Sequence, residues 1–141
     1  MKPSLNEIKE EIDRFVDSNK AFFEQIDFVI GMSRGGLIPA VLVSTKLSKP
    51  LVAAYINKKD EIFFDRPEWI KDKKILIVDD IVRSGRTMYL LKYYIEEHCE
   101  PKAIFIYAPY TVTSMRDEAY DIVVSTTEIK DDVIFPWDYD R

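Results

Sequence analysis

Apolar residues near the start of the chain recur at the spacing of an amphipathic helix. They stand three or four positions apart and so share one helical face: Leu5, Ile8, Ile12, Phe15 and Val16. Ser4 and Glu7 match a capping box, in which each side chain accepts a hydrogen bond from the backbone amide of the other residue. The pattern predicts a helix from about residue 5 to the low twenties.

Short apolar runs further along the chain are typical of strands buried on both faces, as in a parallel sheet. The strands that they predict are 28–32, 51–56, 75–78, 103–108 and 121–125. Helical patterns at 37–47 and from 87 to about 97 lie between them. This alternation predicts an α/β fold: a mostly parallel five-stranded sheet flanked by helices, in one domain over residues 1–141.

Residues 57–72, here called the hood segment, interrupt this alternation. The segment is polar, with Phe63, Phe64 and Trp69 inserted among charged residues. The pattern leaves two structures open, a hairpin and a mobile excursion. The three aromatic side chains could serve either a cover over a site or an interface.

The loop after the predicted strand 75–78 carries the strongest chemical signal. Asp79 and Asp80 end the strand, and carboxylates bind vicinal sugar hydroxyls or a hard divalent cation. Residues 84–87 begin a predicted helix, where backbone amides and the helix dipole form an anion site. Gly85 lets the backbone approach a phosphate, and Arg86 adds charged donors. Together these groups match a phosphorylated sugar.

A second candidate anion loop follows the predicted strand 28–32. Its residues are Ser33, Arg34, Gly35 and Gly36, in which two glycines expose backbone amides and an arginine brings charge. Ligands of α/β sheets bind beyond the carboxyl ends of the strands, so both loops belong to the same edge. One ligand with two separated phosphate groups would explain both loops.

Composition excludes several other classes of function. Twenty Lys and Arg against 25 Asp and Glu give a net charge of −5, which argues against a broad nucleic-acid surface. One cysteine and one histidine exclude an intrachain disulfide and a histidine-based metal site. The chain shows no signal segment and no apolar run long enough to span a bilayer, so we expect a cytoplasmic protein.

Three segments resemble the type I phosphoribosyltransferase family, and within it the xanthine-guanine and hypoxanthine-type purine enzymes. Residues 75–87, ILIVDDIVRSGRT, resemble the signature that binds 5-phosphoribosyl pyrophosphate (PRPP). Residues 29–40 resemble the pyrophosphate loop, and residues 135–138, FPWD, resemble a closing segment. Order and spacing match from about residue 27 onward. The resemblance implies a Mg²⁺-dependent reaction of PRPP with a nucleobase, giving a nucleoside 5′-monophosphate and pyrophosphate, in a dimer or tetramer that acts in purine salvage.

The resemblance also implies a role for each residue by its position. Asp79 and Asp80 would hold the ribose hydroxyls, with Asp80 nearest the magnesium. Val133 and Ile134 would line the base pocket, and a flexible hood segment would cover the site and exclude water. The 5′-phosphate would be held by Ser84, Gly85, Arg86 and Thr87, and the pyrophosphate by Ser33, Arg34, Gly35 and Gly36.

Three positions of the base pocket depart from the purine members. Arg83, the third candidate catalytic residue after Asp79 and Asp80, stands where those members have an aspartate, and an arginine cannot act as a base. Ala108 stands where the purine members have a lysine that recognises the carbonyl oxygen of the purine. Asp132 replaces an aromatic residue that stacks on the base, a contact that contributes roughly 1–3 kcal/mol elsewhere.

These departures leave three hypotheses open. The first is a phosphoribosyltransferase for a purine or related base. The second is a phosphoribosyltransferase for another acceptor, such as an acidic or amino-bearing one, since Arg83 and Asp132 would change the hydrogen-bond pattern of the pocket. The third is a regulatory protein that binds PRPP or a nucleotide without catalysis.

Overall fold

A computed structural model describes residues 1–112, 123–130 and 132–138. In chain order these residues form α1 (Leu5–Ser18), α2 (Lys20–Glu24), β1 (Phe28–Met32), α3 (Leu37–Leu47), β2 (Leu51–Ile56), β3 (Ile62–Phe64), the 3₁₀ helix η1 (Pro67–Ile70), β4 (Lys74–Val78), β5 (Ile81–Val82), α4 (Arg86–His98), β6 (Ala103–Val112) and β7 (Val123–Ile129).

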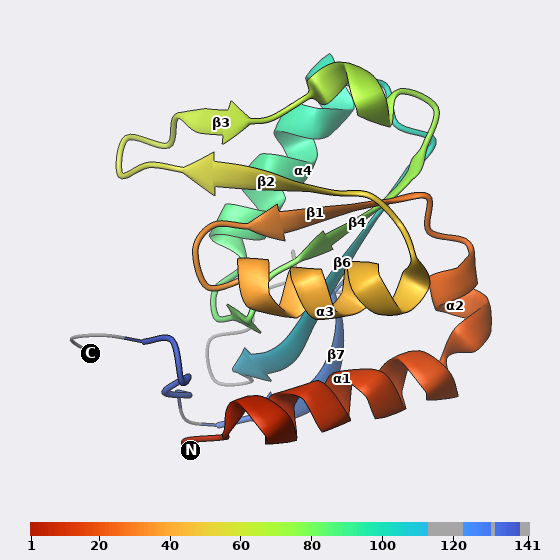
Figure 1. The fold of residues 1–141 in the computed structure, drawn as a ribbon. Coiled ribbons are helices and arrows are strands. Elements are labelled where there is room, and N and C mark those ends of the chain that lie inside the picture. The colour runs from red at the N-terminus through yellow and green to blue at the C-terminus, as the bar shows by residue number, and fades with distance from the viewer. Residues whose placement is uncertain (113–122, 131, 139–141) are drawn as a thin grey trace.

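The strands form one seven-stranded sheet in the order β3-β2-β1-β4-β6-β5, with β7 paired to β6. All neighbouring pairs are parallel except β2 and β3. The carboxyl ends of β1, β2, β4 and β6 therefore lie at one edge, on the left in Figure 1. The α/β class and the mostly parallel sheet are confirmed, and the sheet has two short strands more than the sequence predicted.

Helices cover both faces of the sheet. In Figure 1, α1 and α3 lie in front of it and α4 lies behind. The first face buries Ile8, Ile12 and Val16 of α1, as the helical pattern predicted, and α4 buries Leu91 and Ile95 on the second. Both helix layers shield the central strands, which accounts for their continuous apolar sequence.

Several predicted boundaries match the structure, and others shift for physical reasons. The elements at 28–32, 37–47 and 51–56 match β1, α3 and β2. The capping box at Ser4 and Glu7 is present, but the first helix ends at Ser18. Asn19 breaks it there, because its side-chain amide donates to the Phe15 carbonyl oxygen at 2.9 Å. The strand predicted at 121–125 begins at Val123, and residues 121 and 122 lie outside the described residues.

The strand β6 continues past its predicted end at residue 108, through Pro109. Its first half pairs with β4 up to Tyr107 opposite Val78, and its second half pairs with β5 from Tyr110 opposite Ile81. The ladder is interrupted between them, opposite Pro109, which has no amide hydrogen to donate. Asp79 and Asp80 lie in this interruption, between the end of β4 and the start of β5. The arrangement of the strands therefore leaves the acidic pair outside the ladder of the sheet.

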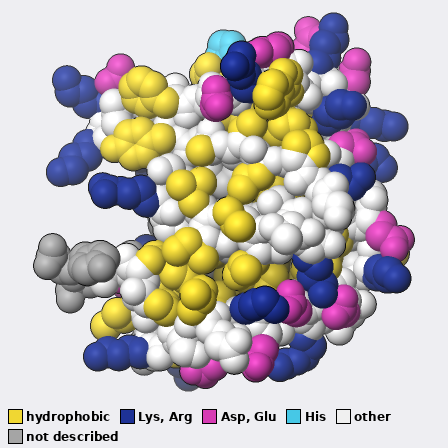
Figure 2. All heavy atoms as spheres, in the orientation of Figure 1, with side chains coloured by type: hydrophobic (Ala, Val, Ile, Leu, Met, Phe, Trp, Pro, Cys, Tyr) yellow, Lys and Arg dark blue, Asp and Glu magenta, His cyan; other side chains and the backbone are white. Residues whose placement is uncertain are grey.

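The hood segment is a hairpin arm followed by a helical turn. Tyr55 of β2 lies opposite Phe63 of β3, and η1 follows. Apolar side chains gather on the surface over β2, β3 and α3 (Figure 2), where Tyr55, Phe63 and Val41 are each about half exposed. Such a face suits a subunit contact, and the oligomer stays a prediction. No helix within the described ranges is long and apolar enough to cross a membrane.

Candidate functional site

The two candidate anion loops touch each other at the carboxyl edge of the sheet. A methyl group added at Gly35 would stand 2.1 Å from Oδ2 of Asp80. One added at Gly36 would stand 2.7 Å from the carbonyl oxygens of Met32 and Val78. Glycine at 35 and 36 therefore allows the loop after β1 to lie directly against the acidic pair that follows β4. The Ser33–Arg34 peptide bond in this loop is cis.

The acidic pair is held by hydrogen bonds from three directions. Asp80 is buried, and its two oxygens accept from the Ile81 amide at 2.7 Å and from Nε1 of Trp137 at 3.1 Å. The Asp79 carboxylate accepts from the Asp80 amide at 2.8 Å. Burial and the neighbouring Asp80 charge raise the pKa of Asp79 well above its usual range, and Arg83 partly opposes this rise. A bound cation would relieve the repulsion between the two carboxylates.

The phosphate loop opens α4. Gly85 takes the left-handed φ of 81° that favours glycine and lies at the helix N-terminus. Because glycine has no capping side chain, the amides of the first turn remain available to a ligand. A cavity of about 220 Å³ opens here, and its walls are Asp79, Ile81, Val82, Arg83, Ser84, Gly85, Thr87 and Met88.

Arg86 is the one predicted phosphate-loop residue that does not line this cavity. Its guanidinium group forms a two-pronged ion pair with Asp60, whose Oδ1 lies 2.9 Å from Nη1. Asp60 belongs to the turn between β2 and β3, so the ion pair ties the hood segment to the phosphate loop. Asp60 was not predicted to be a site residue, because nothing in its local pattern indicates a partner 26 residues away.

Two of the three residues that differ from the purine members, Arg83 and Asp132, are in contact in the expected base half of the site. Nε and Nη2 of Arg83 donate to Oδ1 of Asp132 at 3.1 and 2.8 Å. Ala108, the third departure, is fully buried in β6. The Val133 side chain is fully buried in the core, so only its backbone could face a ligand, whereas Ile134 is 41% exposed.

The tail reaches the acidic pair through stacked aromatic rings. Phe135 is buried against Tyr110, and its ring stacks on Trp137 at a centroid distance of 4.9 Å. This packing aims the Trp137 ring nitrogen at Asp80. The predicted closing segment therefore fixes a carboxylate of the site, a role that the sequence pattern did not reveal.

The donors present fit a magnesium ion shared with a ligand. No group of three or more His, Cys, Asp or Glu side chains lies together among the described residues. Mg²⁺ is commonly bound by one or two carboxylates, with substrate phosphates and water completing its octahedron. Asp79 and Asp80 match that donor set, with Asp80 already oriented by two hydrogen bonds.

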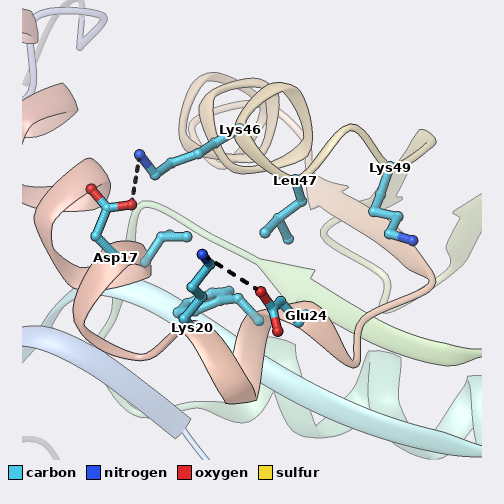
Figure 3. A pocket seen from close by; sticks show the side chains of 8 residues that line it. Asp17, Lys20, Glu24, Lys46, Leu47 and Lys49 are labelled. Atoms are coloured by element: carbon cyan, nitrogen blue, oxygen red, sulfur yellow. Dashed lines mark ion pairs between the residues drawn. The ribbon is translucent and has the colours of Figure 1, made fainter.

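A larger hollow, of about 430 Å³, lies at the opposite edge of the sheet and differs in its chemistry. It lies between the end of α1, α2 and the end of α3, and Figure 3 shows its charged rim. Lys46 pairs with Asp17 at 3.1 Å, and Lys20 lies 3.9 Å from Glu24. Two of its three lysines are thus paired with neighbouring carboxylates, and none of the described strands has its carboxyl end there. The carboxyl edge is the better candidate site.

Residues 4–141 match the family described as the phosphoribosyl transferase domain. The chain belongs to the phosphoribosyltransferase family. This match confirms the resemblance carried by the two loops and the FPWD segment, and it identifies an enzyme of the phosphoribosyltransferase type.

Individual relatives of this phosphoribosyltransferase agree with the family. Xanthine-guanine phosphoribosyltransferase of Idiomarina loihiensis is 30% identical over 124 residues, which cover 82% of this chain and 73% of the relative. The transcriptional regulator GfcR of Methanocaldococcus jannaschii is 30% identical over 112 residues, which cover 73% of this chain and 53% of the relative. The crystal structure of a purine phosphoribosyltransferase from Pyrococcus horikoshii shares the fold, with a TM-score of 0.81, 24% identity, and coverage of 99% and 94% of the two chains.

Proposed function

We propose that this phosphoribosyltransferase transfers a 5-phosphoribosyl group from PRPP to a nucleobase, with Mg²⁺. The contact between Gly35 and the Asp80 carboxylate carries the proposal, since it joins two anion loops into one site. A ligand with phosphates at both ends of a ribose would fit this pair of loops.

Each part of the site has a chemical task in the proposed reaction. Asp79 and Asp80 accept hydrogen bonds from the ribose hydroxyls, and the amides of residues 84–87 hold the 5′-phosphate. Residues 33–36 hold the pyrophosphate. Magnesium, when bound, neutralises the leaving group. A bond forms between a base nitrogen and C1 of the ribose, the bond from C1 to the pyrophosphate oxygen breaks, and the base nitrogen loses its proton.

The hood segment would exclude water from this reaction. A carbon with oxocarbenium character is hydrolysed if water reaches it, so a cover over the ribose serves the transfer. The ion pair between Asp60 and Arg86 supports this role, because it brings the turn of the hood segment to the phosphate loop.

The acceptor class follows from the relatives and is the first thing to test. The similarity to a xanthine-guanine phosphoribosyltransferase supports a purine acceptor and a role in purine salvage. Pyrophosphate release should be measured with PRPP, Mg²⁺ and each of guanine, xanthine, hypoxanthine, adenine, uracil and orotate.

The matched variants for this assay are Asp80→Asn and Asp17→Asn. The first removes the charge that faces the pyrophosphate loop, so we expect PRPP binding and turnover to be lost. The second makes the same change in the hollow at the opposite edge and should leave both intact. Unchanged PRPP affinity and turnover in Asp80→Asn would sink the proposed site.

A second candidate function is ligand sensing without transfer. The similarity to GfcR, whose name describes a transcriptional regulator, favours it, as does the contact that joins Arg83 to Asp132 across the base half. Magnesium-dependent binding of PRPP, with no pyrophosphate released by any base in the panel, would support this function over the first.

A further inference from the structure

The ion pair between Arg83 and Asp132 joins two residues that the resemblance assigns to the base pocket. Both donors of Arg83 reach the same oxygen of Asp132, at 3.1 and 2.8 Å. The Asp132 oxygen also accepts from the Val133 amide at 2.9 Å, and the Val133 side chain is anchored in the core. Asp132 is therefore held in place, and Arg83 reaches across to it from the wall of the 220 Å³ cavity.

A base ring cannot lie between these two groups while they are in contact. Carbon atoms pack at about 3.5–4.0 Å, so two groups that sandwich a ring stand roughly 7 Å apart. The atoms of Arg83 and Asp132 are less than half that distance apart, at 2.8 Å. An acceptor must either open the pair or supply a partner for Arg83 from the side.

Opening the pair leaves a guanidinium group that needs a new partner. The Arg83 side chain is only 33% exposed, so water replaces the lost carboxylate incompletely. A neutral base offers at most a carbonyl oxygen or ring nitrogen. An acceptor with a carboxylate or another anionic edge offers charged oxygens in the planar arrangement that a guanidinium group binds best.

We propose that the Arg83–Asp132 pair selects acceptors with an anionic edge, Arg83 binding that edge and Asp132 acting as the competitor that it displaces. This inference rests on the proposed transfer from PRPP. Asp79 and Arg83 line the same cavity, so an acceptor bound there would lie beside the guanidinium group.

Matched acceptors that differ in one charged group test the inference. Orotate is uracil with a carboxylate, and nicotinate differs from nicotinamide by a carboxylate in place of an amide. With PRPP and Mg²⁺, we expect the charged member of the productive pair to have a kcat/KM roughly tenfold higher or more, the size of one charge-assisted hydrogen bond.

Two variants should move the KM of the charged acceptor in opposite directions. Arg83→Asp removes the binding group, so KM should rise about tenfold or more and the preference should disappear. Asp132→Asn removes the competitor, so KM should fall. A pair with a merely structural role would impair the enzyme in both variants. Arg14→Asp, the same charge change on the exposed face of α1, is the control and should leave the preference intact.

The outcomes separate this inference from the proposed function. Wild-type protein that binds no PRPP, or that releases no pyrophosphate with any acceptor, overturns the transfer reaction and the inference with it. Release that occurs only with neutral purines, that is equally fast with charged and neutral acceptors, or that is unchanged in Arg83→Asp overturns the inference alone and leaves the transfer reaction standing.

Discussion

The proposed phosphate half and the proposed base half of this site are held together in different ways. The phosphate half consists of two loops in close contact: Gly35 lies against the Asp80 carboxylate, Gly36 lies against strand carbonyls, and Asp80 is fixed by two hydrogen bonds. The base half is closed by one partly exposed ion pair between Arg83 and Asp132. This difference agrees with the proposed function, in which PRPP is the constant ligand and the acceptor is the part that varies.

The largest effect should follow from disturbing the phosphate half at Gly35. In Gly35→Ala the new methyl group meets the Asp80 carboxylate at 2.1 Å, so either the loop or the carboxylate must move. Because displacements of about 1 Å cost reacting groups their alignment, we expect kcat/KM for PRPP to fall about 100-fold or more. Steady-state kinetics, with circular dichroism to confirm the fold, provides the measurement. A loss of less than a few fold would show that the two loops act separately.

Removing one charge of the acidic pair should raise stability. The raised pKa of Asp79 means that the folded state binds its proton more tightly than the unfolded chain does. Ionisation of Asp79 therefore lowers the stability of the folded state at pH values above about 3.9, the pKa of an aspartate in the unfolded chain. We expect Asp79→Asn to stabilise the metal-free protein at pH 7 by on the order of 1 kcal/mol. Urea unfolding in EDTA at pH 4 and pH 7 checks this, since the gain should shrink at the lower pH.

Freeing the phosphate-loop arginine should have a smaller effect on binding. Asp60 holds Arg86 by an exposed ion pair. Exposed ion pairs are weak, so Asp60→Asn should tighten PRPP binding by no more than about fivefold. Arg86 lowers the pKa of Asp60, so the pair persists at neutral pH and is lost only as the pH falls below about 4. Calorimetric titration at pH 7 in low and high salt checks this, and weaker binding by Asp60→Asn would contradict it.

The smallest effect should come from the base half. Because the Arg83–Asp132 pair is partly exposed, the double variant Arg83→Ala, Asp132→Ala should change the free energy of unfolding by less than about 1 kcal/mol. Thermal and urea unfolding provide the measurement. A larger loss would mean that the pair supports the fold, and the contrast between the two halves would then be wrong.

The sequence predicted the elements that follow from local patterns. Continuous apolar runs predicted β1 and β2 with their observed ends, and the glycine-rich loops fell at the carboxyl edge because strand order in α/β sheets places them there. The two-residue β5 and the extension of β6 past Pro109 were missed, since both depend on pairing between distant segments.

The contacts of the candidate site were the least predictable part. Arg83 and Asp132 were each identified as departures from the purine members, but they stand 49 positions apart, and no local pattern indicated their pairing. Their opposite charges were the one signal that could have joined them. Trp137 reaches Asp80 across 57 residues through core packing that no local pattern encodes.

A crystal structure with PRPP and Mg²⁺ bound tests the central claim most directly. We expect the 5′-phosphate on the amides of residues 84–87, the ribose hydroxyls on Asp79 and Asp80, and the pyrophosphate on residues 33–36. PRPP bound elsewhere, for example among the lysines of the hollow at the opposite edge, or bound with Asp80 out of contact, would contradict it.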